Sequence, residues 1–79
     1  MVHRNPLRVR NGGDASLVVI VEPWASEFEL PPGAECEVVA INPALQPTLG
    51  VELLDGRLIV WINEGGSTYE VWRDGVQLD

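Results

Sequence analysis

The segment from Phe28 to Val38, FELPPGAECEV, alternates apolar and acidic residues on both sides of a Pro-Pro-Gly turn. Successive side chains of a strand point to opposite faces, so this alternation predicts two β-strands that each have one apolar and one acidic face. The apolar set is Phe28, Leu30, Cys36 and Val38, and the acidic set is Glu27, Glu29, Glu35 and Glu37. We predict a β-hairpin with the apolar face buried. Its four glutamates lie in water and protect an edge of the sheet from unwanted pairing.

The rest of the chain also divides into short β-rich runs that are separated by turn residues, and no window has the apolar spacing of a helix. We expect strands at 7–9, 17–22, 27–30, 34–41, 48–54, 57–62 and 68–73, with a short final piece at 76–78. Asp55-Gly56 predicts a tight hairpin, whereas the proline-containing stretch 42–47 could cross between sheets. The pattern predicts an all-β fold, a small antiparallel β-sandwich of about seven short strands, with a closed β-barrel as the alternative.

The chain has 79 residues, which indicates a single β domain over residues 1–79, and we expect residues 1–5 to form a frayed arm. Cys36 is the only cysteine, so no disulfide can stabilise the domain and a reducing compartment is expected. No apolar run behind the N-terminus resembles a signal peptide, and the longest apolar runs are too short to cross a bilayer. We therefore expect a cytoplasmic protein without a membrane partner.

The net charge of −7 argues against nucleic acid as a partner, because binding phosphates requires a basic surface. The distribution is uneven, since three of the five basic residues lie within the first ten positions and the chain contains no lysine.

Two expected strands are apolar on both faces, at 17–21 and 58–62. Antiparallel sheets usually have one polar face, so these strands suggest a surface that a partner covers. A homodimer is the commonest solution for a small protein, and we rank it ahead of a different protein partner. The interface candidates are Val18, Ile20, Leu58 and Val60. The alternatives are central strands of a closed barrel, or apolar side chains scattered over an ordinary surface.

Tryptophan supplies the remaining binding candidates. Trp24 follows Glu22-Pro23 in a loop, where it either contributes to a binding site or folds back to cap the core, and we favour the second role. Trp72 shares a strand face with Glu70, whereas Trp61 shares one with Ile59. We therefore expect Trp72 to be the better interface candidate of these two.

Catalytic and metal-binding patterns are not found in the sequence. His3 is the only histidine, so neither a blue-copper site nor a Ser-His or Cys-His catalytic pair can be built around a well-placed imidazole. The four glutamates could attract calcium, but the Asp-rich loop typical of such sites is missing, which favours a solvated acidic face. We predict no catalytic residue, no metal, no cofactor and no enzymatic activity.

The run of residues 28–35, followed by Val38 and Val39, resembles the F-x-L-x-P-G element of immunoglobulin-like and cupredoxin-like β-sandwich domains. The run of residues 11–17 is similar to their opening strand, so the resemblance covers residues 5–41. The chain lacks the Cys-Trp-Cys pattern of antibody domains and lacks copper ligands. With Glu22-Pro23-Trp24 it also resembles small bacterial proteins, and neither resemblance implies an activity.

These observations favour a non-enzymatic protein-interaction module that self-associates. The alternative is a small-ligand or carbohydrate-binding module that uses the exposed side chains of Trp24 and Trp72. An enzyme ranks third, because it would require a concave pocket with converging carboxylates.

Overall fold

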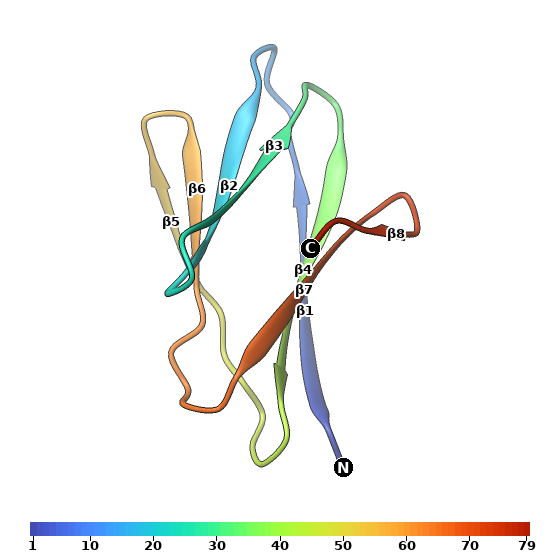
Figure 1. The fold of residues 1–79 in the computed structure, drawn as a ribbon. Coiled ribbons are helices and arrows are strands. Elements are labelled where there is room, and N and C mark those ends of the chain that lie inside the picture. The colour runs from blue at the N-terminus through green and yellow to red at the C-terminus, as the bar shows by residue number, and fades with distance from the viewer.

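Eight strands form two four-stranded sheets that pack face to face (Figure 1). The computed structural model describes residues 1–79. The strands are β1 (His3–Arg10), β2 (Leu17–Glu22), β3 (Ser26–Leu30), β4 (Glu35–Asn42), β5 (Gly50–Leu54), β6 (Arg57–Trp61), β7 (Thr68–Arg73) and β8 (Val76–Gln77). Sheet A has the order β1-β4-β7-β8, and sheet B has the order β3-β2-β6-β5.

The predicted all-β sandwich is confirmed, with eight strands instead of about seven and two open sheets instead of a closed barrel. One expectation about strand direction is wrong, because β2 and β6 pair in parallel while every other pair is antiparallel. Parallel neighbours need a long crossover connection, and here the chain between them passes through β3, β4 and β5. The stretch 42–47 does cross from sheet A to sheet B, and the Asp55-Gly56 hairpin joins β5 to β6 as expected.

The predicted hairpin between β3 and β4 is wrong, because the two strands belong to different sheets. The Pro31-Pro32-Gly33 turn carries the chain from sheet B to sheet A, and Gly33 adopts a φ of 77° there. The division into faces is nevertheless right: Leu30 and Cys36 are buried and Phe28 packs against the core. Alternation determines which side of each strand is apolar, but the two apolar sides meet across the core and not within one sheet.

The N-terminal segment is ordered into β1 from His3 onward, which corrects the expectation of a frayed arm over residues 1–5. His3 is opposite Asn42 in the β1–β4 register, and side chains fix the same segment to the 42–47 connection. The Asn5 amide donates to the Pro47 carbonyl over 2.9 Å, and the Gln46 amide donates to the Arg4 carbonyl over 3.2 Å. Only the first two residues precede the strand.

The core between the sheets consists mainly of β-branched aliphatic side chains, which suit paired strands. Its buried members are Val9, Val19, Val21, Leu30, Cys36, Val38, Ala40, Val60, Ile62 and Val71. Partly buried Phe28 and Tyr69 pack against this cluster. The cluster draws on both sheets, so it holds the two layers together without a disulfide.

A buried asparagine fixes the loops at one end of the sandwich. Asn11 donates through Nδ2 to the carbonyls of Ala15 and Leu30, over 2.8 and 2.9 Å, and its Oδ1 accepts from the Gly13 N–H. Its backbone carbonyl accepts from Gly33 N–H over 2.7 Å. This one residue therefore ties the β1–β2 loop to the turn that crosses between the sheets.

Asn42 has the same role at the opposite end, where it is almost fully buried. Its Nδ2 donates to the Gly65 carbonyl and to Ser67 Oγ, over 3.2 and 2.9 Å. Its Oδ1 accepts from the backbone N–H groups of Ala44 and Leu45. No buried side-chain nitrogen or oxygen in the structure lacks a hydrogen-bond partner.

Candidate functional site

The outward side of sheet B carries part of the predicted interface. Val18 and Ile20 point to this outer face and are partly exposed, as expected. Leu58 and Val60 point inward, Val60 fully buried and Leu58 packed against the core, so their assignment to an interface is wrong. Arg57 lies on the same side of β6 as Ile59 and Trp61, so the one charged residue of this strand marks its outward side, and the prediction named the inward set instead.

The parallel register of β2 and β6 brings four apolar side chains together on the outer face of sheet B, and Leu54 of β5 joins this face opposite Arg57. Ile20 is opposite Ile59 and Glu22 is opposite Trp61. We call this set the outer stripe; its members are Val18, Ile20, Leu54, Ile59 and Trp61. Trp61 keeps 37% of its surface exposed. The sequence predicts that Trp61 and Ile59 share a face, and the structure agrees. The sequence also favours Trp72 over Trp61 as an interface residue.

Carboxylates surround the outer stripe on three sides. Glu27 and Glu29 of β3 lie opposite the two apolar residues of β2, and Glu52 of β5 lies opposite Ile59. The rim is Glu22, Glu27, Glu29 and Glu52, and Arg57 is the single basic residue on this face. The face therefore combines an apolar centre with an unbalanced negative rim.

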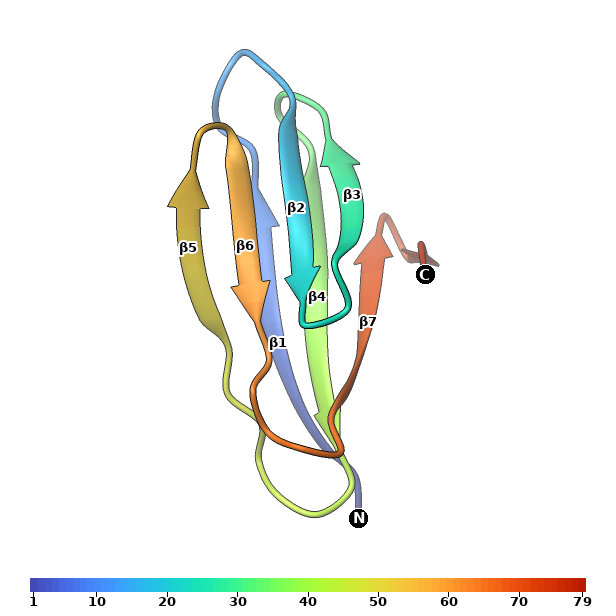
Figure 2. The same cartoon turned by 60° about the vertical axis from the view of Figure 1, so that its left-hand side comes forward.

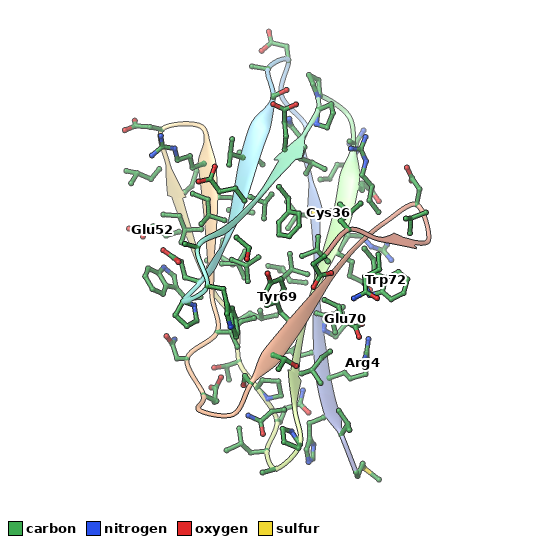
Figure 3. The ribbon with its side chains drawn as sticks, in the orientation of Figure 1. Arg4, Cys36, Glu52, Tyr69, Glu70 and Trp72 are labelled. Carbon is green, nitrogen blue, oxygen red and sulfur yellow. The ribbon has the colours of Figure 1, made fainter.

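The outer face of sheet A has the opposite character, because its charges are matched. Its three arginines come from β1 and its three glutamates from β4 and β7; they are Arg4, Arg8, Arg10, Glu35, Glu37 and Glu70. Arg4 Nη2 lies 2.7 Å from Glu70 Oε1, and Arg10 Nε lies 3.8 Å from Glu35 Oε1. The hydrogen bond from Arg4, aided by one from Trp72, lowers the pKa of Glu70 (Figure 3).

Strand β5 forms one edge of sheet B, and all five of its residues are exposed (Figure 2). Val51 and Leu53 lie opposite the inward-pointing Val60 and Leu58, yet 52% and 73% of their surfaces remain exposed. Sheet A does not cover this edge. Sequence reasoning missed these residues, although the Asp55-Gly56 hairpin signal had located the strand.

Trp24 lies in the turn between β2 and β3 and remains exposed. Its ring contacts that of Tyr69, with the centroids 4.7 Å apart and the planes inclined by 45°. Tyr69 reaches between the sheets from β7, and its hydroxyl donates to Ser26 Oγ (Figure 3). Trp24 thus packs against Tyr69, which connects the two sheets at the margin of the core.

Trp72 lies on the outer face of sheet A, where its Nε1–H donates to Glu70 Oε1 over 2.9 Å. It borders a shallow depression of about 480 Å³ near the β7–β8 turn. The lining residues are Arg8, Glu35, Cys36, Glu37, Trp72, Asp74 and Gly75. Burial raises the pKa of the Cys36 thiol, so this group stays protonated and is a poor nucleophile. The depression suits polar recognition better than nucleophilic chemistry.

No group of three or more His, Cys, Asp or Glu side chains is placed to hold a metal ion. None of the eight elements is a helix, and the structure offers no helix that could cross a membrane.

Comparison with known proteins adds no relative to this description. Neither a protein-family model, nor a curated protein, nor a solved structure matches the chain. The resemblance to immunoglobulin-like and cupredoxin-like domains therefore stays a prediction, and the functional argument depends on the surfaces of the chain itself.

Proposed function

We propose that this chain is a non-enzymatic protein-interaction module that self-associates through sheet B. The observation that carries the proposal is the apolar surface that sheet B leaves in water, on the outer stripe and along β5. Antiparallel sheets that face solvent normally present polar side chains, and contiguous apolar patches with polar rims mark interaction sites. A closed two-fold dimer is the commonest way in which a small protein covers such a surface.

The outer face of sheet A is a weaker candidate for self-association than that of sheet B. Val39 is an apolar residue on the outer face of sheet A, yet only 3% of its surface is exposed. Pro6 and Glu70 lie directly opposite it on the two neighbouring strands. Sheet A therefore covers its central valine and matches its own charges, although Ile41 on the same face stays partly exposed, so it has less to gain from a partner.

Sedimentation velocity over a wide range of protein concentration tests the proposal. We expect a reversible monomer–dimer equilibrium in the micromolar range. A double variant, Leu53→Lys with Ile59→Lys, should shift it to monomer, because both substitutions place charge on the apolar surface of sheet B. Thr68→Lys, on the outer face of sheet A, is the control and should leave it unchanged. A wild-type chain that is monomeric at every concentration contradicts self-association.

A second candidate function is the binding of a small ligand or carbohydrate, and the depression beside Trp72 favours it. An aromatic ring next to carboxylate and guanidinium groups can stack on a sugar ring and hydrogen-bond to its hydroxyls. Titration of tryptophan fluorescence with a panel of sugars tests this function. Trp72→Ala should abolish the response, whereas Trp24→Ala should preserve it, and a flat response of the wild-type chain excludes the function.

The proposal places the module in the cytoplasm. Cys36 is a free, buried cysteine, and a single reduced cysteine fits a reducing compartment. Fractionation of cells that express a tagged chain tests the location, and recovery outside the cytoplasmic fraction would contradict it.

A further inference from the structure

We propose that two copies of the chain pair along their β5 strands, antiparallel and centred on Val51, and so join two four-stranded sheets into one continuous sheet. The inference rests on the proposed self-association and specifies its contact. It differs from a face-to-face dimer, because the outer stripes of the two copies would lie side by side and remain open.

The chemistry of the β5 edge selects an extended polypeptide as its occupant. An edge strand presents a row of N–H and C=O groups that only another strand satisfies in full. Proline, lysine and bulges are the usual protections of an edge, and β5 (GVELL) contains none of them. Its register with β6 is regular from Gly50 to Leu54, so no bulge interrupts the edge along which the ladder would continue.

The charges of the four edges favour β5 as the place where two copies meet. Each chain has a net charge of −7, so two copies repel each other except where few charges face one another. The β1 edge carries three arginines and interrupts its own donors with Pro6. The β3 edge carries Glu27 and Glu29, and β8 has only two residues. The β5 edge carries a single charge, on Glu52.

The register follows from the requirement that opposite residues point to the same face, which allows any of the three central residues of β5 to lie on the two-fold axis. An axis at Glu52 would set two carboxylates directly opposite each other, which is unfavourable. An axis at Leu53 would set Val51 opposite Asp55, which belongs to the turn and has a φ of 45°. An axis at Val51 avoids both problems, and its overlap extends beyond β5 to Leu49, which lies opposite Leu53 of the other copy.

An axis at Val51 also places complementary groups together on the outer face. Glu52 of one copy then lies opposite Gly50 of the other, and Gly50 is in turn opposite Trp61. Two strand spacings separate Glu52 from that tryptophan, about 10 Å, and the intervening glycine has no side chain to obstruct contact. The only indole N–H that is hydrogen-bonded within the chain belongs to Trp72, so Trp61 has a free donor for the incoming carboxylate.

On the inner face the same register brings apolar side chains together. Leu53 of one copy lies opposite Leu49 of the other, and the two Val51 side chains meet on the axis. Leu49 already packs against the core, whereas Leu53 is 73% exposed in the single chain. Pairing would therefore cover the most exposed leucine of sheet B with aliphatic side chains.

Lysine substitutions distinguish pairing along the β5 edge from association through the outer face of sheet B. Leu53→Lys should raise the dimer dissociation constant at least about tenfold, because it removes an apolar contact and places a charge in the joint. Val76→Lys is the matched control, since Val76 is 60% exposed on the opposite sheet, and it should leave the constant unchanged. Circular dichroism should show the same fold in both variants.

The outcomes distinguish this inference from the proposed function. Weakening by Leu53→Lys but not by Ile59→Lys supports β5 pairing. If Ile59→Lys dissociates the dimer and Leu53→Lys does not, self-association through sheet B stands and β5 pairing is wrong. A monomeric wild-type chain overturns both.

Disulfide trapping tests the register. Directly opposite residues have Cα atoms about 4.5–5.5 Å apart, within the range of a disulfide. Val51→Cys should therefore cross-link two copies faster than Glu52→Cys or Leu53→Cys, with Val76→Cys as the background rate. A mixture of Gly50→Cys and Glu52→Cys chains should form the mixed dimer. Faster trapping at Glu52→Cys or Leu53→Cys would overturn the register, and background rates at all positions would overturn β5 pairing.

Discussion

The two outer faces of the sandwich differ in how far their central apolar residues are exposed to solvent. On sheet A, Val39 lies at the centre of the face and is almost completely covered, and the Arg4–Glu70 pair joins the two strands that flank it. On sheet B, Ile20 and Ile59 occupy the corresponding central strands and keep part of their surface in water. Arginine stems and a tryptophan can cover apolar neighbours while their polar ends stay hydrated. On sheet B, Arg57 and Trp61 are the long side chains of this kind, and they leave Ile20 and Ile59 partly exposed.

This difference shows that the number of apolar residues on a face is a poor guide to its role. What matters is whether long amphipathic side chains from the same face cover them. Sheet A does this for Val39, although Ile41 on the same face stays partly exposed, and its three arginines balance its three glutamates. On sheet B the apolar centre stays partly exposed, and the carboxylates of the rim outnumber the single arginine. Figure 3 shows one of these carboxylates, Glu52, pointing away from the core.

The largest expected effect is the difference in the free energy of unfolding when the same substitution is made on the two faces. Val39→Asp should lower the free energy of unfolding by about 3 kcal/mol, because it buries a carboxylate without a partner. Ile59→Asp should cost about 1 kcal/mol or less, because this position is partly open to water. Urea denaturation monitored by tryptophan fluorescence measures both. Similar losses for the two variants would show that the faces are equally covered.

A smaller effect concerns the contact that connects the two sheets. Tyr69→Phe removes the hydroxyl that donates to Ser26 and should lower the free energy of unfolding by about 1 kcal/mol. Ser26→Ala should have an effect of similar size, and the double variant should cost less than the sum because both changes remove the same bond. Additive losses in the double variant would show that the bond contributes nothing to stability.

Ionic strength should act on the association of sheet B more than on the stability of sheet A. Salt screens repulsion between the acidic rims of two copies, so the dimer dissociation constant should fall a few-fold between low and physiological salt. The double variant Glu27→Gln with Glu29→Gln should reduce this dependence if the outer faces associate, and should leave it nearly unchanged in β5 pairing, because β3 then lies about 20 Å from the partner's β5. Sedimentation velocity at several salt concentrations measures the change, and weaker association at higher salt would contradict the assigned role of the rim.

The smallest effect is the pH dependence that Glu70 contributes on sheet A. Its pKa in the folded chain lies below the ordinary value of 4.5, because it accepts hydrogen bonds from Arg4 and Trp72. The stabilisation is therefore present above pH 4.5 and is lost as the pH falls through the folded-state pKa. Melting temperatures below pH 4.5 should decline less steeply in Glu70→Gln than in the wild type. Arg4→Gln should likewise make the melting temperature decline less steeply below pH 4.5 than in the wild type.

Much of the fold could be predicted because alternation is a local property. The β7 pattern placed Tyr69 and Val71 on one face and Glu70 and Trp72 on the other, and the structure agrees. The acidic sides of β3 and β4 were also identified correctly. Pairing could not be predicted, because the same apolar side can be buried within a hairpin or between two sheets.

The candidate site was predicted in part for the same reason. Val18 and Ile20 were predicted as interface candidates and lie on the outer face, on the same side of β2 as Glu22. In β6, Arg57 likewise lies on the outward side, but the predicted residues Leu58 and Val60 lie on the opposite, inward side. The five residues of the outer stripe come from β2, β5 and β6, which are far apart in the chain, so no local pattern could assemble them.

Length, alternation and turn residues by themselves determined that this chain is a small all-β domain and the approximate position of most of its strands. The tertiary structure decided which strands are neighbours, which face of β6 is buried and which edge is left open. The physical reason is that side-chain direction is set within one strand by its own backbone, whereas exposure depends on what the other strands cover. The unprotected β5 edge is visible only once its neighbours are known.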